Sequence, residues 1–94
     1  MIRETIERIQ TIEQSFDMLQ KAEGENPDTL RENAELREML RLLRRYYEDG
    51  QWLQDYELDE QGLLPRDLKR GVLSQDGVYD FLERMEKIVP KEDV

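Results

Sequence analysis

The side chains that could do chemistry in this chain are carboxylates, because its 94 residues include no histidine and no cysteine. The usual nucleophile–base pairs are therefore missing, as are the imidazole and thiolate ligands of zinc sites. Carboxylates are densest in "DYELDE", residues 55–60. On a helix Asp55 and Asp59 would share one face, which makes them weak candidates for a Mg²⁺ or Ca²⁺ site.

Counted from Asp55, this stretch fails as a calcium-binding loop. Its sixth position is Glu60 where such a loop needs glycine, and its twelfth is Arg66 where it needs glutamate. A small helical bundle also offers little room for a catalytic pocket. We therefore expect a solvated acidic face, with no catalytic residue, no cofactor and no enzymatic activity. A weak carboxylate metal site with some activity is the alternative.

The net charge of −9 is concentrated in one band of the sequence. Between Glu48 and Leu64 there are six acidic residues and no basic one. Such acidity argues against direct binding to nucleic acid or to anionic membranes. The band also suggests another hypothesis, in which Asp55, Glu57 and Asp59 imitate a nucleic acid and occupy a basic cleft on a partner protein.

A basic cluster follows the acidic band. Arg66, Lys69 and Arg70 could form a contact to a phosphate or a nucleic acid, and they are candidates for binding a partner. The alternative is intramolecular, because these side chains lie close in sequence to the acidic band and to a helix end. We expect them to fold back on the band or to cap that helix.

Aromatic residues offer a third candidate surface. Tyr47, Trp52 and Tyr56, with Tyr46 and Tyr79, are of the types that dominate protein interfaces. The same residues could fill the core where helices meet. We expect Trp52 to be core, and for Tyr47 and Tyr56 both interpretations stay open.

The elements that must position these residues are helices. Apolar residues at steps of three and four predict a first helix over residues 1–22. Gly24 is expected to end it, and Pro27 to begin a second helix over residues 27–48. Because the two are similar in length and joined by a short loop, we expect an antiparallel helical hairpin.

Charged residues outside the apolar stripes of these two helices are expected to face water. They are Glu4, Glu7, Arg8, Glu13 and Asp17 on the first helix, and Arg37, Arg41 and Arg44 on the second.

The rest of the chain is predicted to form a short helix over residues 51–61, an irregular clasp over 62–74 and a last helix over 75–89. Gly62 and Pro65 end the short helix. Five apolar side chains of the clasp are candidates to seal the open end of the bundle. They are Leu63, Leu64, Leu68, Val72 and Leu73.

Residues 46–82, "YYEDGQWLQDYELDEQGLLPRDLKRGVLSQDGVYDFL", resemble the signature of a domain-of-unknown-function family of short bacterial proteins. The shared pattern is a tyrosine pair, a tryptophan, an acidic "DYE.DE.G" and "LP.DLKRGVLS.DG.YD.L". The resemblance implies a small, mostly helical bacterial protein, and it supplies no activity, ligand or catalytic residue. It marks the clasp and the acidic band before it as the family's signature.

These observations together predict a single all-α domain over residues 1–94, a small helical bundle made of a long antiparallel hairpin, one short helix and one C-terminal helix. The predicted function is a non-catalytic protein–protein interaction module that docks a protein partner, with a homodimer as one form. No apolar run approaches the roughly 18 residues of a membrane span, and the N-terminal "MIRETIERIQ" does not have the apolar h-region that is typical of a signal peptide. We therefore expect a cytoplasmic protein that binds no membrane.

Overall fold

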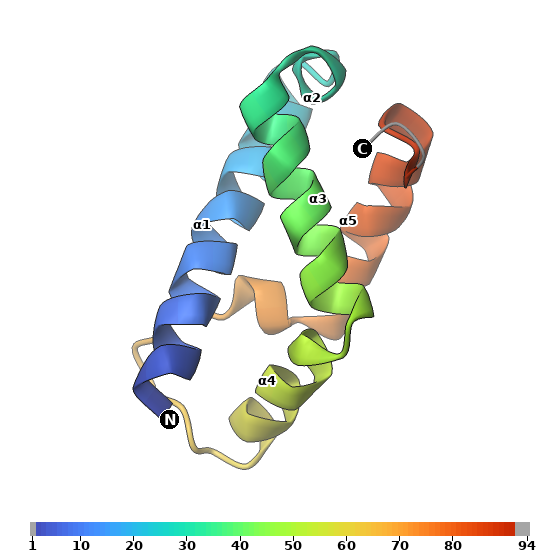
Figure 1. The fold of residues 1–94 in the computed structure, drawn as a ribbon. Helices are drawn as coiled ribbons and strands as arrows, with labels where there is room; N and C mark the ends of the chain where they lie inside the picture. Colours follow the sequence, from blue (N-terminus) through green and yellow to red (C-terminus); the bar gives the residue numbers. More distant parts are fainter. Residues whose placement is uncertain (1, 92–94) are drawn as a thin grey trace.

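The structure is a computed structural model that describes residues 2–91, and all its regular structure in that range is helical. This confirms the predicted all-α bundle. The molecule measures 38 × 22 × 21 Å. Figure 1 shows how its helices are arranged. They are α1 (Ile2–Glu25), α2 (Thr29–Glu32), α3 (Ala34–Glu48), α4 (Gln51–Glu60), the 3₁₀ turn η1 (Gly71–Leu73) and α5 (Gln75–Ile88).

Helix α1 is longer than the predicted 1–22, because Gly24 does not break it. Gly24 keeps a negative φ inside the helix, and the N–H of Asn26 still bonds the carbonyl of Ala22 at 2.9 Å. The chain leaves the helix only before Pro27, whose ring disfavours the helical conformation for the residue that precedes it. The stop signal is therefore the proline, not the glycine.

The single second helix predicted over 27–48 is wrong, because Asn33 divides it into α2 and α3. Asn33 has φ −90° and ψ 117°, and its side-chain oxygen accepts the N–H of Leu36 at 3.0 Å. This is an N-cap, the conformation in which asparagine competes with the helical backbone. The break turns α2 across the end of the bundle, where Leu30 is fully buried.

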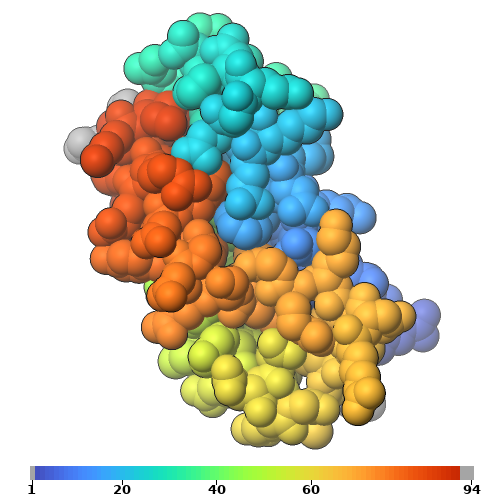
Figure 2. Space-filling model, turned by 180° about the vertical axis from the view of Figure 1, so that it is seen from behind, coloured from blue at the N-terminus to red at the C-terminus, as the bar shows by residue number. Residues whose placement is uncertain are grey.

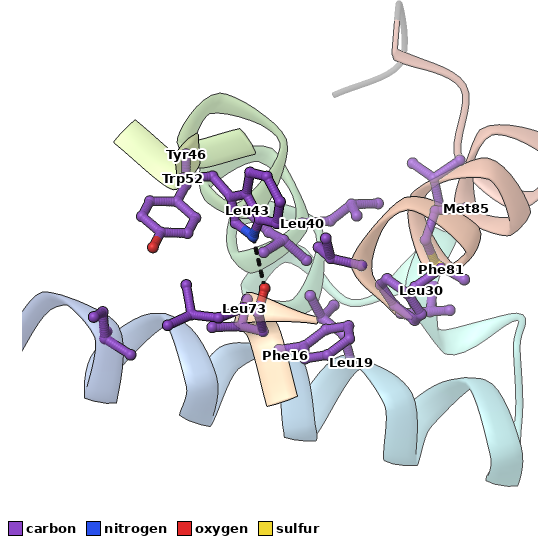
Figure 3. Close-up of a cluster of buried hydrophobic side chains, with 14 of the residues drawn as sticks. Phe16, Leu19, Leu30, Leu40, Leu43, Tyr46, Trp52, Leu73, Phe81 and Met85 are labelled. Atoms are coloured by element: carbon purple, nitrogen blue, oxygen red, sulfur yellow. Dashed lines mark hydrogen bonds between the residues drawn. The ribbon is translucent and has the colours of Figure 1, made fainter. Parts of the chain in front are cut away.

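The hydrophobic core lies where α1, α3 and α5 meet. Helices α1 and α3 run antiparallel and pack on each other, as predicted for the hairpin, and α5 lies beside them (Figure 1). The rings of Phe16 and Phe81 meet edge to face with centroids 5.2 Å apart. Each large apolar side chain buried here contributes about 1.5–3 kcal/mol. Figure 3 shows the cluster, which includes Phe16, Leu19, Leu30, Leu40, Leu43, Phe81 and Met85.

The predicted clasp, residues 62–74, closes the end of this core. Its 3₁₀ turn η1 contacts α1, α4 and α5, and Figure 2 shows the segment against α1 and α4. Leu64 and Leu68 are buried, as are Val72 and Leu73 in η1. Leu63 is 55% exposed, so its predicted sealing role is wrong. The clasp is the junction of three helices.

Candidate functional site

Asp55 is the most deeply buried carboxylate that the structure describes, and its oxygens are occupied. Arg8 donates to it twice, from Nη2 at 2.7 Å and from Nε at 3.1 Å, and the Tyr46 hydroxyl donates at 2.6 Å. The hydrogen bond to Asp55 raises the pKa of Arg8. Burial, and then Asp55, raise the pKa of Tyr46 far above its usual range.

The expectation that Asp55 lies on a solvated face beside Asp59 is therefore wrong. Asp55 has 0% of its surface exposed, whereas Asp59 lies nearer the surface and pairs with Arg70 at 3.1 Å. Among residues 2–91 no three carboxylates come together as metal ligands. Nothing in this geometry supports the weak metal candidates Asp55 and Asp59.

The peptide groups of Val72 in η1 are held from two sides. Glu13 of α1 accepts the Val72 N–H at 2.7 Å, and the indole N–H of Trp52 donates to the Val72 carbonyl at 2.8 Å (Figure 3). Glu13 is buried, so its predicted place on the water face is wrong. The clasp is thus anchored to α1 and α4 by hydrogen bonds as well as by packing.

The acidic band is largely neutralised by bases from other parts of the chain. Four of its six carboxylates form ion pairs, and a fifth, Glu60, lies beside Tyr56 and raises the pKa of that phenol. The pairs are Glu48–Lys91, Asp49–Arg45, Asp55–Arg8 and Asp59–Arg70. A run of six acids in the sequence is therefore not an uncompensated acidic surface.

The basic cluster divides among three places. Arg70 pairs with Asp59, as expected for a cluster that folds back on the band. Lys69 pairs instead with Asp17 of α1, at 3.4 Å. Arg66 is exposed and has no ion-pair partner within the part of the chain that the structure describes. The three side chains do not form one anion site.

The aromatic candidates do come together, as a row across two helices. The ring of Trp52 lies 5.1 Å from Tyr47 and 5.0 Å from Tyr56, stacked on the latter at 17°. Trp52 is buried, which confirms its predicted place in the core, whereas Tyr47 and Tyr56 are half-buried. We call Tyr47, Trp52 and Tyr56 the aromatic row. Its two tyrosines are partly exposed, and the tryptophan that both of them contact is buried.

A hollow of about 280 Å³ adjoins this row between α3 and α5, and we call it the α3–α5 groove. Its apolar walls are Tyr47, Tyr79 and Leu82, and Glu83 and Glu86 stand at its rim. Tyr79 is 48% exposed and donates to Glu83 at 2.8 Å, and that bond raises the pKa of Tyr79. Tyr79 thus extends the aromatic surface onto α5.

Arg44 lies in the wall of the groove, and its predicted place on an exposed face is wrong. It is buried and donates through Nη2 to the Val89 carbonyl at 2.5 Å, with Glu86 3.7 Å away. Burial lowers the pKa of Arg44. Its Nε and Nη1 atoms are shielded from solvent and have no hydrogen-bond acceptor.

A shared sequence signal could have revealed these buried charges. Glu13 follows Ile9 by four residues and precedes Phe16 by three, so it lies on the apolar stripe itself. In the same way Arg44 follows Leu40 by four. A charged residue that interrupts an apolar stripe is a candidate for a buried, hydrogen-bonded position.

Comparison with protein-family models identifies a family. The family model described as Domain of unknown function (DUF4298) matches residues 6–92, nearly the whole chain. No curated protein and no solved structure matches. Within residues 2–91, no helix combines the length and apolar character needed to span a bilayer.

Proposed function

The chain belongs to this family of domains of unknown function, and we propose that it is a non-catalytic docking module that binds a protein partner. The proposed contact surface is the aromatic row with the α3–α5 groove. The observation that carries the proposal is the arrangement of Tyr47, Trp52, Tyr56 and Tyr79, which brings aromatic side chains from three helices to one partly exposed place.

Rigidity supports a binding role for this surface. Trp52 is fixed by packing on both sides and by its hydrogen bond to Val72, so Tyr47 and Tyr56 rest on an ordered support. Aromatic residues already held in place lose little conformational entropy on binding. Tyrosine and tryptophan are also the residue types enriched at the energetic centres of interfaces.

A catalytic role has less support. The chain has no histidine or cysteine, and the most deeply buried carboxylate that the structure describes, Asp55, is held by Arg8 and Tyr46. A carboxylate fixed in this way serves structure, since its lone pairs already accept hydrogen bonds.

The nucleic-acid-mimic alternative also has less support, because it was suggested by an acidic band whose carboxylates are largely paired. A mimic needs exposed, unpaired carboxylates, whereas Asp55 is buried and Asp59 is paired with Arg70. Only Glu57 of the three proposed residues is exposed. For this reason we favour the aromatic surface over the acidic band.

Affinity capture from the native lysate tests the proposal. Wild-type protein is compared with Tyr79→Ser, in the groove, and with the control Leu63→Ser, which removes a similarly exposed apolar side chain in the clasp. We expect Tyr79→Ser to lose the partner and Leu63→Ser to retain it, with both variants folded by circular dichroism. Partner capture that survives Tyr79→Ser unchanged contradicts the proposed surface.

A further inference from the structure

We infer that the α3–α5 groove receives a lysine or arginine side chain of the partner. This inference rests on the proposed docking function and specifies the chemistry of the partner. It follows from three features of the groove: its size, the sign of the charge that a ligand can reach, and the chemical character of the side chains that line it.

The size of the hollow suits one side chain. Sites for whole small ligands span about 300–1,000 Å³, and this hollow, at about 280 Å³, lies just under that range. A long side chain projecting from a partner surface can fill such a space while the partner's backbone stays outside. The hollow is therefore large enough for one long side chain and lies at the lower limit for a whole small ligand.

The charge that a ligand can reach in the groove is negative. Glu86 is 51% exposed, and Glu83 is exposed and bonded only to the neutral hydroxyl of Tyr79. Lys91 is already paired with Glu48. The two rim carboxylates can therefore contact an incoming cation, and Lys91 adds little net charge against it.

Besides Lys91, Arg44 is a base of the groove that would favour an anion, but Arg44 is buried. An anion would bind through direct hydrogen bonds to the guanidinium, but Nε and Nη1 are closed off from solvent and Nη2 is bonded to Val89. Glu86, 3.7 Å away, offsets part of this charge, so of the two rim carboxylates Glu83 is the one without a paired base. An accessible carboxylate outweighs a shielded guanidinium for a ligand that arrives from solvent.

The walls match the stem of a basic side chain. Tyr47, Tyr79 and Leu82 offer ring faces and an aliphatic surface. Lysine and arginine bury their methylene stems on such surfaces, and their charged ends are attracted to aromatic faces. An apolar stem with a cationic end therefore satisfies both the walls and the rim.

A second hollow gives the rim carboxylates another open side. It lies along α5 and shares Glu83 and Glu86 with the groove. Asp80 adds a third carboxylate to this second hollow. The hollow is also lined by two basic residues, of which Arg84 is bonded to Glu23 and Lys87 is exposed. The acidic rim is thus approachable along α5 as well as from the groove.

The test is an NMR titration of the whole chain with N-acetyl-arginine amide as the probe. N-acetyl-citrulline amide, of the same shape without the charge, and N-acetyl-glutamate serve as comparison probes. We expect the arginine probe to shift the amide signals of Tyr79, Leu82 and Glu86. The citrulline probe should bind about three- to fivefold more weakly, as the loss of an exposed charge pair implies.

Matched variants separate this pocket from general acidity. Glu83→Gln with Glu86→Gln should weaken the arginine probe, whereas the control Glu32→Gln with Glu35→Gln, which makes the same change in net charge away from the groove, should not. Equal effects of the two pairs, equal binding of citrulline, or preferred binding of the glutamate probe would overturn the inference. If Tyr79→Ser abolishes partner capture but Glu83→Gln with Glu86→Gln leaves it intact, the docking function stands and the basic anchor is wrong.

Discussion

At the scale of single residues, burial decides what the charged side chains do. A carboxylate taken out of water is costly unless hydrogen bonds and an opposite charge compensate it. Asp55 has both, from Arg8 and Tyr46. This residue, which looks in the sequence like one acid among six, is therefore structural.

Asp55→Ala should destabilise the fold by about 3 kcal/mol, because it leaves Arg8 and the buried Tyr46 hydroxyl without their acceptor. The matched control is Asp59→Ala, one helical turn later in α4, whose surface pair with Arg70 contributes under about 1 kcal/mol. Urea denaturation followed by far-UV circular dichroism measures both. Similar small losses for the two variants would show that the Asp55 network adds little.

Tyr46 should make the fold sensitive to alkali. Its pKa is raised in the folded state, so the unfolded chain releases the phenolic proton first, near the ordinary tyrosine value of about 10. The contribution of Tyr46 to stability is therefore complete below about pH 10 and falls as the pH rises above it. We expect Tyr46→Phe to show a smaller decline in unfolding free energy between pH 9 and 11 than wild type, by about 1 kcal/mol or more. Parallel declines would contradict this.

At the scale of the elements, η1 of the clasp matters more than its length suggests. It contacts three helices, and both peptide groups of Val72 are bonded to side chains from different helices. Gly71, beside Val72, has little free space. A Cβ at Gly71 would lie 3.0 Å from Oε2 of Glu13 and 3.5 Å from Oε1, the oxygen that accepts the Val72 N–H.

Gly71→Ala should therefore destabilise the protein by about 1 kcal/mol, because the Glu13 carboxylate must move to relieve the contact at Oε2, and this movement strains the bond of Oε1 to the buried Val72 N–H. Gly24→Ala is the matched control. It lies in α1 with nothing within 4 Å of the new Cβ, and the higher helix propensity of alanine should stabilise by about 0.5 kcal/mol. Thermal and urea unfolding measure the two changes in unfolding free energy, which are expected to have opposite signs. A stabilising Gly71→Ala would show that Glu13 relaxes without loss.

At the scale of the whole molecule, charge opposes the association of two identical copies. Each copy carries a net charge of −9, and the rim of the α3–α5 groove is acidic. The predicted self-association stays a prediction, and this repulsion determines how a dimer should respond to salt. Any dimer should be weakest at low ionic strength, where the repulsion is poorly screened and extends over about 30 Å.

Light scattering from micromolar to near-millimolar protein, at low and at high salt, measures this. We expect the monomer mass throughout at low salt, with any increase confined to high salt, where the repulsion is screened. A mass that doubles with concentration at low salt would contradict the expectation and make a second copy the partner.

The sequence by itself determined the all-α class and the approximate places of the hairpin, α4 and α5. These follow from local periodicity, since residues three and four apart share a helix face whatever the rest of the chain does. It also placed Trp52 in the core. It misjudged the helix break because the N-cap at Asn33 is a local competition between two acceptable conformations.

Only the tertiary structure decided which charges are buried and which surface is open. Asp55 meets Arg8 across 47 positions of sequence, and Val72 meets Glu13 across 59. No local pattern encodes such partners, because they depend on how α1, α4 and the clasp pack. The same packing neutralises the acidic band and leaves Tyr79 exposed at the groove, so the candidate site moved from the acids of α4 to the aromatic side chains between α3 and α5.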